Sequence, residues 1–271
     1  MLKKRLIPVL LLRNGVLVQS RGFKRYQLLG NPSAAVERLS SWASDELIYL
    51  DISSSPTYDL NRDDLNHPEF SNIEDIIRLI ASKCFMPLTF GGGIRSIDHV
   101  ETRLRCGADK VALNTAALDD PKLVTECARR FGSQCVVVSI DAKRTEDGWQ
   151  VFRGGRTAVE QDPVSWATRV QELGAGEILL NSIDQDGSKR GFDLPLISAV
   201  SEAVSIPVIG MGGAGEWDHL VQVLATDASA VAVANMLHHS ENSVYSAKEH
   251  LVAKGCNVRT PLPLSTQPRN L

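Results

Sequence analysis

The sequence predicts one (β/α)8 TIM barrel, an α/β fold, over residues 1–258, followed by a loose C-terminal tail over 259–271. Three observations predict this fold. The chain has 271 residues, which suits an α/β barrel that uses about 250 residues as a single domain. Short apolar runs alternate with segments of helical periodicity, and the two halves of the chain resemble each other. A doubly wound open sheet is the competing architecture, because it shows the same alternation.

Each predicted strand is a short, continuously hydrophobic run, as expected for a parallel sheet that is covered on both faces. The predicted strands are residues 5–12, 46–52, 86–90, 110–113, 135–141, 177–181, 206–210 and 229–234. Helices are predicted near residues 32–43, 72–83, 97–106, 121–131, 162–173, 193–204, 216–226 and 241–254. Several of them begin with a capping residue followed by proline, such as Asn31-Pro32 and Asp162-Pro163, which is a typical helix start.

An internal repeat divides the predicted barrel into two halves of four strand–helix units. Residues 86–94 (MPLTFGGGI) resemble residues 206–214 (IPVIGMGGA). At the same separation along the chain, Asp98-His99 matches Asp218-His219. Similarity at this spacing indicates a duplicated half-barrel.

Composition and charge exclude several classes of function. The chain carries 29 lysine and arginine residues against 32 aspartate and glutamate residues, and the cations are interspersed, so a nucleic-acid interface is not expected. The apolar runs are too short to span a membrane, and Pro8 and Arg13 interrupt the N-terminal run, which argues against a signal peptide. The five cysteines are widely spaced without a Cys-x-x-Cys pair. We therefore expect a cytoplasmic protein with no disulfide frame, metal site or cofactor.

Two glycine-rich turns follow the third and seventh predicted strands. Gly91-Gly92-Gly93 and Gly212-Gly213 thus occupy corresponding places in the two halves, at the strand ends where barrel enzymes carry their chemistry. Glycine lets backbone N–H groups approach an anion closely, although barrel loops also use glycine for tight turns. The pair predicts a phosphorylated small molecule with a phosphate at each end. The residues predicted to face phosphate are Gly92, Asn114, Thr115, Asp186, Gly187, Gly213, Ala234 and Asn235.

Two aspartates at strand ends are predicted to act at the mouth of the barrel. Asp141 ends the apolar run of the fifth strand, where a carboxylate is costly unless it caps a turn, pairs with a cation or acts on substrate. It is the candidate acid/base group, and an ion pair with Lys143 or Arg144 is the alternative. Asp51 ends the second strand and is expected to order the mouth by hydrogen bonding; an ionic contact with a neighbouring loop is the alternative.

From residue 4 to residue 258, the sequence resembles the HisF family, the cyclase subunit of imidazole glycerol phosphate synthase. The most specific stretches are residues 90–95 (FGGGIR), 107–111 (GADKV), 131–134 (FGSQ), 140–144 (IDAKR), 174–180 (GAGEILL), 184–191 (DQDGSKRG) and 212–215 (GGAG). The resemblance implies a heterodimer with a HisH-type glutaminase, which docks at the N-terminal ends of the strands and sends ammonia through the barrel. In that family, ammonia cleaves a bis-phosphorylated ribonucleotide and closes the imidazole ring.

The family's acid/base pair is only half present. Asp141 matches its second aspartate, but Leu11 stands where the first is expected. Leucine cannot transfer a proton, and losing a positioned acid/base group typically costs about 10²–10⁴ in rate. Further departures at the same mouth are Gln19 for lysine, Asn181 for threonine, and Met211 and Asn235 for serine. These departures indicate a changed task.

The opposite end of the predicted barrel keeps the family's charges. The ring that gates ammonia entry is matched by Arg5, Glu46, Lys110 and Glu177, and Asp109 matches a residue that faces the glutaminase. Charges at strand ends that serve stability and solubility are the alternative interpretation. The resemblance thus implies that ammonia entry and partner docking are preserved while ring closure is compromised.

This combination resembles the WbuZ-like HisF paralogues, which are associated with surface-polysaccharide (O-antigen) loci. The resemblance implies a subunit that supplies ammonia to a separate ATP-dependent amidotransferase acting on an acetamido sugar. Two alternatives remain: an active cyclase of histidine biosynthesis, and a scaffold that binds its glutaminase without turnover. The segment 53–71 is longer than a βα loop requires and is interpreted as a lid or partner contact, or equally as a disordered insertion.

Overall fold

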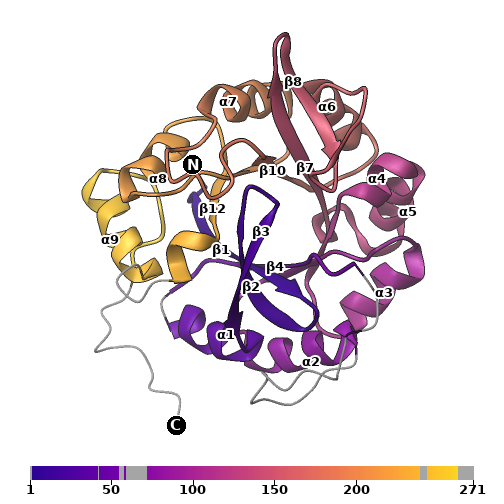
Figure 1. The fold of residues 1–271 in the computed structure, drawn as a ribbon, viewed down its shortest axis with the longest axis horizontal. Helices are drawn as coiled ribbons and strands as arrows, with labels where there is room; N and C mark the ends of the chain where they lie inside the picture. Colours follow the sequence, from indigo (N-terminus) through magenta and orange to yellow (C-terminus); the bar gives the residue numbers. More distant parts are fainter. Residues whose placement is uncertain (1, 42, 55–57, 59–71, 239–242, 262–271) are drawn as a thin grey trace.

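The computed structural model describes residues 2–41, 43–54, 58, 72–238 and 243–261. Within them, eight parallel strands form a closed barrel (Figure 1). The barrel strands are β1 (Arg5–Arg13), β4 (Leu47–Asp51), β5 (Leu88–Gly91), β6 (Lys110–Leu113), β7 (Val136–Thr145), β10 (Glu177–Ser182), β11 (Val208–Met211) and β12 (Ala230–Val233). Each pairs with the next, and β12 pairs with β1. This closure confirms the predicted TIM barrel and excludes the open sheet.

Helices surround the barrel on its outside (Figure 1). They are α1 (Pro32–Ser41), α2 (Ile73–Lys83), α3 (Ile97–Arg105), α4 (Thr115–Asp119), α5 (Lys122–Phe131), α6 (Pro163–Glu172), α7 (Leu194–Ala203), α8 (Trp217–Leu224) and α9 (Val244–Ala253), with 3-10 turns η1 (Ser133–Cys135) and η2 (Asn235–His238). Several begin at a side-chain cap: Asn72 accepts from the backbone N–H of Asp75, and Asp162 from those of Val164 and Ser165. None of the described helices is long and apolar enough to cross a membrane.

Two hairpins and the short helix α4 add to the predicted elements. The strand β2 (Val16–Arg21) pairs antiparallel with β1 and with β3 (Arg25–Gly30), and this hairpin lies across the centre of the ring in Figure 1. The strand β7 runs beyond the predicted end at 141 and pairs with β8 (Gly148–Arg153), which pairs with β9 (Thr157–Ala158). In the predicted insertion, positions 55–57 and 59–71 lie outside the described residues, as do 262–271 of the tail.

The continuously hydrophobic strands supply two separate apolar layers. Along β1, Leu6 and Leu10 face outward and pack against the helices, whereas Ile7 and Val9 face the barrel interior. This alternation follows from the period of two residues in a strand. Burial on both faces is the reason that the strands carry no polar alternation.

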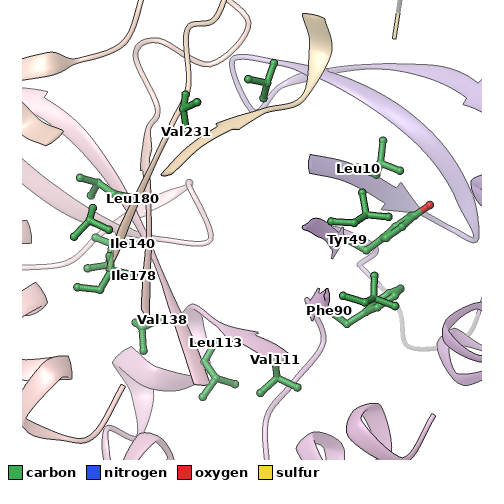
Figure 2. Packing of buried hydrophobic residues seen from close by; sticks show 14 of the residues in the cluster. Leu10, Tyr49, Phe90, Val111, Leu113, Val138, Ile140, Ile178, Leu180 and Val231 are labelled. Atoms are coloured by element: carbon green, nitrogen blue, oxygen red, sulfur yellow. The ribbon is translucent and has the colours of Figure 1, made fainter. Parts of the chain in front are cut away.

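The outer layer contains one aromatic pair on neighbouring strands (Figure 2). The rings of Tyr49 and Phe90 are stacked with their centroids 5.2 Å apart, and both side chains are buried. The Tyr49 hydroxyl donates to the Pro32 carbonyl oxygen at 2.7 Å. This bond ties the start of α1 to the barrel wall and satisfies the buried hydroxyl.

The two halves of the barrel repeat one local structure. In α3 the Nδ1 atom of His99 accepts from the backbone N–H of Arg95, and in α8 the Nδ1 atom of His219 accepts from that of Gly215. Both histidines occupy the third position of their helix. The sequence similarity around Asp98-His99 and Asp218-His219 therefore corresponds to the same helix-start geometry in each half.

Candidate functional site

A cavity of about 550 Å³ opens at the C-terminal ends of the barrel strands. Its walls come from most of the strand ends and from both hairpins. Among the residues that line it are Leu11, Phe23, Tyr26, Leu50, Asp51, Gly92, Gly93, Arg95, Asn114, Thr115, Ser139, Asp141, Arg153, Arg156, Leu179, Asn181, Asp186 and Met211. This is the end of the fold where barrel enzymes place their reacting groups.

Asp141 lines this mouth, where it is buried and accepts hydrogen bonds from two amides. The Asn114 Nδ2 atom donates to Oδ2 at 3.0 Å, and the Asn181 Nδ2 atom donates to Oδ1 at 3.2 Å. Burial outweighs these hydrogen bonds and raises the pKa of Asp141 to about 6. A carboxyl group with that pKa can both accept and donate a proton near neutral pH.

The neighbouring cations do not neutralise Asp141. The Lys143 ammonium lies 5.9 Å from the centre of the Phe152 ring, and the Arg144 guanidinium pairs with Asp193 at 3.2 Å. In β7, these side chains stand beyond the inward-facing position that Asp141 occupies. The ion-pair alternative for Asp141 is therefore wrong.

Among the described residues that line the mouth, Asn181 is the one with a fully buried side-chain atom that lacks a hydrogen-bond partner. Its Nδ2 atom is used by Asp141, but its Oδ1 atom is buried and has no hydrogen-bond partner. The side chain is 6% exposed. An unsatisfied buried acceptor costs about 1–3 kcal/mol, so this oxygen is suited to a donor from a bound molecule.

Leu11 makes the wall near the end of β1 apolar. It is 8% exposed, pairs in register with Leu50 of β4, and belongs to the inner hydrophobic layer with Leu179 and Met211. No proton-transfer group stands at this position. Asp51 does not replace it, because its carboxylate accepts hydrogen bonds from its own loop.

Asp51 holds the loop that follows β4. Its Oδ1 atom accepts from the backbone N–H and the hydroxyl of Ser53, and its Oδ2 atom accepts from the Tyr58 hydroxyl at 2.9 Å. Burial and the neighbouring Asp51 carboxylate raise the pKa of Tyr58. Asp51 thus forms hydrogen bonds within its own loop, and its role toward a ligand stays a prediction.

The first glycine turn lies directly on the cavity. Gly92 has a φ of +94°, and a Cβ there would lie 1.9 Å from the Asp51 carbonyl oxygen, so only glycine fits. Gly92, Asn114 and Thr115 all line the cavity, as expected. Three arginines also line it on this side: Arg95, Arg153 and Arg156.

The second glycine turn packs against the segment that follows β10, and the β2–β3 hairpin contacts the neighbouring Asp186-Gly187 turn. Of the residues predicted on this side, Asp186 lines the cavity, whereas Gly187, Gly213, Ala234 and Asn235 lie outside it. The Asp186 carboxylate accepts from the Ser20 hydroxyl at 3.2 Å and from the Phe23 backbone N–H at 3.1 Å. The Asn235 Nδ2 atom donates to the Ser20 carbonyl oxygen.

The other end of the barrel contains a closed ring of ion pairs. Arg5 contacts Glu46 and Glu177, and the Lys110 Nζ atom lies 2.9 Å from Glu46 and 3.0 Å from Glu177. Burial alone lowers the pKa of Lys110, but the Glu177 and Glu46 carboxylates hold it above its ordinary value. Both glutamates are buried. These residues thus pair with one another across the barrel instead of facing solvent as separate charges.

Asp109 is exposed at the same end of the barrel. Its Oδ2 atom accepts from the Leu88 backbone N–H at 2.8 Å. Part of its carboxylate therefore orders the start of β5, and the rest faces outward.

The molecule is thus a (β/α)8 barrel with a buried acid at its mouth and a ring of ion pairs across its opposite end. Residues 5–243 match the family described as histidine biosynthesis protein. The chain is 40% identical over 262 residues to the imidazole glycerol phosphate synthase subunit HisF of Streptococcus sanguinis (strain SK36), covering 96% of this chain and 100% of that protein. The chain belongs to the histidine biosynthesis protein family and, within it, to the HisF proteins.

Proposed function

We propose that this chain is an ammonia-conducting HisF-type subunit that pairs with a HisH-type glutaminase. Its glutaminase would dock where the ion-pair ring and Asp109 lie, and ammonia would pass along the barrel axis to the mouth. The ammonia would then serve the amidination of an acetamido sugar in surface-polysaccharide biosynthesis, through a separate ATP-dependent amidotransferase. The observation that carries the proposal is an intact charged ring at one end and Leu11 in place of an acid at the other.

The barrel interior between the two ends supports the passage of neutral ammonia. Above the ring, the inward-facing side chains are mostly apolar, and several are small: Ala112, Ala230 and Ala232. An apolar passage disfavours ammonium, because burying an unpaired charge is costly. In the ring, two cations balance the charges of two carboxylates. If Lys110 moved aside to open the ring, Arg5 would still hold Glu46 and Glu177.

The mouth offers one acid/base group in place of the two that the HisF family uses. Asp141 is ionised in most molecules at pH 7, because its pKa is about 6, and can accept a proton there. Leu11, on the facing wall, can neither donate nor accept a proton. A reaction that needs an acid and a base on opposite sides of its substrate therefore lacks half of its machinery.

An active cyclase of histidine biosynthesis is the second candidate. The name of the Streptococcus sanguinis relative favours it, and Asp141 alone would then serve as the acid/base group. A scaffold that binds its glutaminase without turnover is the third candidate; the buried, fully paired ring argues against it, since a scaffold needs no such gate.

The test uses the purified chain with saturating ammonium and the bis-phosphorylated ribonucleotide on which HisF cyclases act. We expect no loss of this substrate. Turnover at the rate of an ordinary cyclase would overturn the proposal and identify a histidine enzyme. The matched variant is Leu11→Asp, which restores an acid opposite Asp141; cyclase activity in this variant alone would show that Leu11 is the cause.

A further inference from the structure

We propose that Lys248 of α9 is a positioning residue of the ion-pair ring. Through Asp45, it fixes the strand starts that carry Arg5 and Glu46. The inference rests on the proposed function only in treating the ring as an ammonia gate. The contacts that carry it lie at the N-terminal ends of the strands and join a helix on the outside of the barrel to the charges across its opening.

Lys248 is an ionisable side chain in an apolar setting. It is 0% exposed, which makes it the most deeply buried charged residue in the part of the chain that the structure describes. On α9 it shares a buried face with Val244, Ala247 and Leu251, which belong to the outer apolar layer. Burial lowers the pKa of Lys248, and the Asp45 carboxylate offsets only part of that effect. Because taking an ammonium out of water is costly, its position depends on the acceptors that surround it.

Two acceptors from the loop between α1 and β4 meet this ammonium. The Lys248 Nζ atom donates to the Asp45 Oδ1 atom at 2.6 Å and to the Ala43 carbonyl oxygen at 2.7 Å. Ala43 has a φ of +61°, a left-handed conformation that is unfavourable for alanine. Buried ion pairs add little stability over apolar packing, and their best-documented use is to specify one arrangement of the chain. The pair is therefore suited to fixing this loop in one position.

Asp45 extends the constraint to β1. Its Oδ2 atom accepts from the Leu6 backbone N–H at 2.8 Å, and its own backbone N–H donates to the Leu6 carbonyl oxygen at 3.4 Å. Arg5 directly precedes Leu6 in the chain. Glu46 directly follows Asp45, so both ring residues stand one residue away from these bonds. A shift of the loop would move Arg5 and Glu46 relative to each other and disturb the contact between them.

The start of β6 repeats half of this arrangement. Asp109 directly precedes Lys110, and its Oδ2 atom accepts from the Leu88 backbone N–H at 2.8 Å, just as the Asp45 carboxylate accepts at β1. Asp109 is exposed, however, whereas Asp45 is held from within the molecule by Lys248. The side of the ring at β1 and β4 is thus anchored by α9, and the side at β6 rests on an exposed carboxylate.

The test reads the ring in the full chain by NMR of the lysine ammonium groups, because hydrogen bonds to carboxylates slow the exchange of ammonium hydrogens with water. The Lys110→Met variant identifies the Lys110 signal. We expect Lys248→Met to broaden or remove this signal, and Lys248→Arg, which keeps the charge, to retain it. The matched control is Arg103→Met, which removes another buried helix cation, paired with Glu74 at 3.2 Å and remote from the ring.

An unchanged Lys110 signal in Lys248→Met, or an equal change in Arg103→Met, would overturn the inference. If Lys248→Met does not fold, Asp45→Asn takes its place, because it keeps an acceptor for Leu6 and removes the charge that faces Lys248. The same loss of the Lys110 signal is then expected, and a retained signal would refute the positioning role.

A second measurement follows product formation with the glutaminase and the amidotransferase present. Lys248→Met should lower the ratio of the glutamine-driven rate to the ammonium-driven rate, and Arg103→Met should leave this ratio unchanged. The NMR outcomes are separate from the proposed function, because they need neither ammonia nor a partner. Turnover of the bis-phosphorylated ribonucleotide would refute the proposed function, whereas the Lys110 signal tests this inference alone.

Discussion

Replacing Lys110 by methionine tests the ion-pair ring most directly. Lys110→Met keeps most of the side chain's length and apolar stem but removes the charge that joins Glu46 to Glu177. Each glutamate then keeps only its contact with Arg5. We expect the variant to fold with lower stability and to lose the coupling between glutamine hydrolysis and ammonia use.

The expected loss of stability depends on how deeply the ion pairs of Lys110 are buried. Removing one partner of a fully buried ion pair costs about 3–5 kcal/mol, because it leaves an uncompensated charge. The Lys110 side chain is 19% exposed, and both glutamates keep a cation, so we expect about 2–3 kcal/mol. For a chain of this size, the melting temperature should fall by about 4–10 °C.

The control is the same substitution in an exposed pair. Lys83 contacts Glu37, with side chains 36% and 60% exposed, and such pairs contribute about 0–1 kcal/mol. Calorimetry of both variants measures the difference. If Lys110→Met destabilises the chain no more than Lys83→Met does, the ring is not a buried network and the reasoning fails.

The functional part of this prediction needs the glutaminase and the amidotransferase. Formation of amidated product is followed with glutamine and, separately, with ammonium as the nitrogen source. Lys110→Met should reduce the glutamine-driven rate and spare the ammonium-driven rate, because external ammonium reaches the acceptor without crossing the ring. A proportional loss of both rates would contradict a gate at Lys110.

Two further predictions concern the mouth. Burial raises the pKa of Asp141 from an ordinary 3.8 to about 6, so the folded chain binds this proton more tightly than the unfolded chain; the resulting stabilisation is complete below about pH 4 and is lost as the pH rises through about 6. Asp141→Asn should therefore be more stable than the native chain at pH 8, by up to about 3 kcal/mol, and equally stable at pH 4, as measured by urea unfolding. The substitution should also abolish any cyclisation. A variant that shows no pH-dependent gain in stability would contradict the raised pKa. Gly92→Ala and Gly22→Ala both place alanine at a positive φ, but only the first meets backbone, at the Asp51 carbonyl oxygen. We expect thermal unfolding to show a loss of about 1 kcal/mol for Gly22→Ala and a clearly larger loss for Gly92→Ala, and equal losses would show that the close approach at Gly92 is not limiting.

Local patterns in the sequence account for the barrel and for much of its chemistry. Continuous apolar runs predicted strands whose ends agree with the structure within about two residues, except for β7. The antiparallel pairing of β1 with β2 could also have been predicted from the sequence, because Asn14-Gly15 is a strong hairpin signal and both residues have positive φ. The apolar strand before Asp141 was enough to predict a carboxylate in an apolar setting.

Strand period and strand order can be read from the residues alone, and they place the closed barrel, the acid at its mouth, the leucine opposite and the charges at the N-terminal ends of its strands. The difference between the two sides of the mouth depends instead on contacts between distant parts of the chain. Ser20 meets Asp186 across 166 positions of the chain, and Asn235 meets Ser20 across 215. Such contacts depend on how a hairpin closes over loops from the other half-barrel, and local periodicity contains no information about that closure.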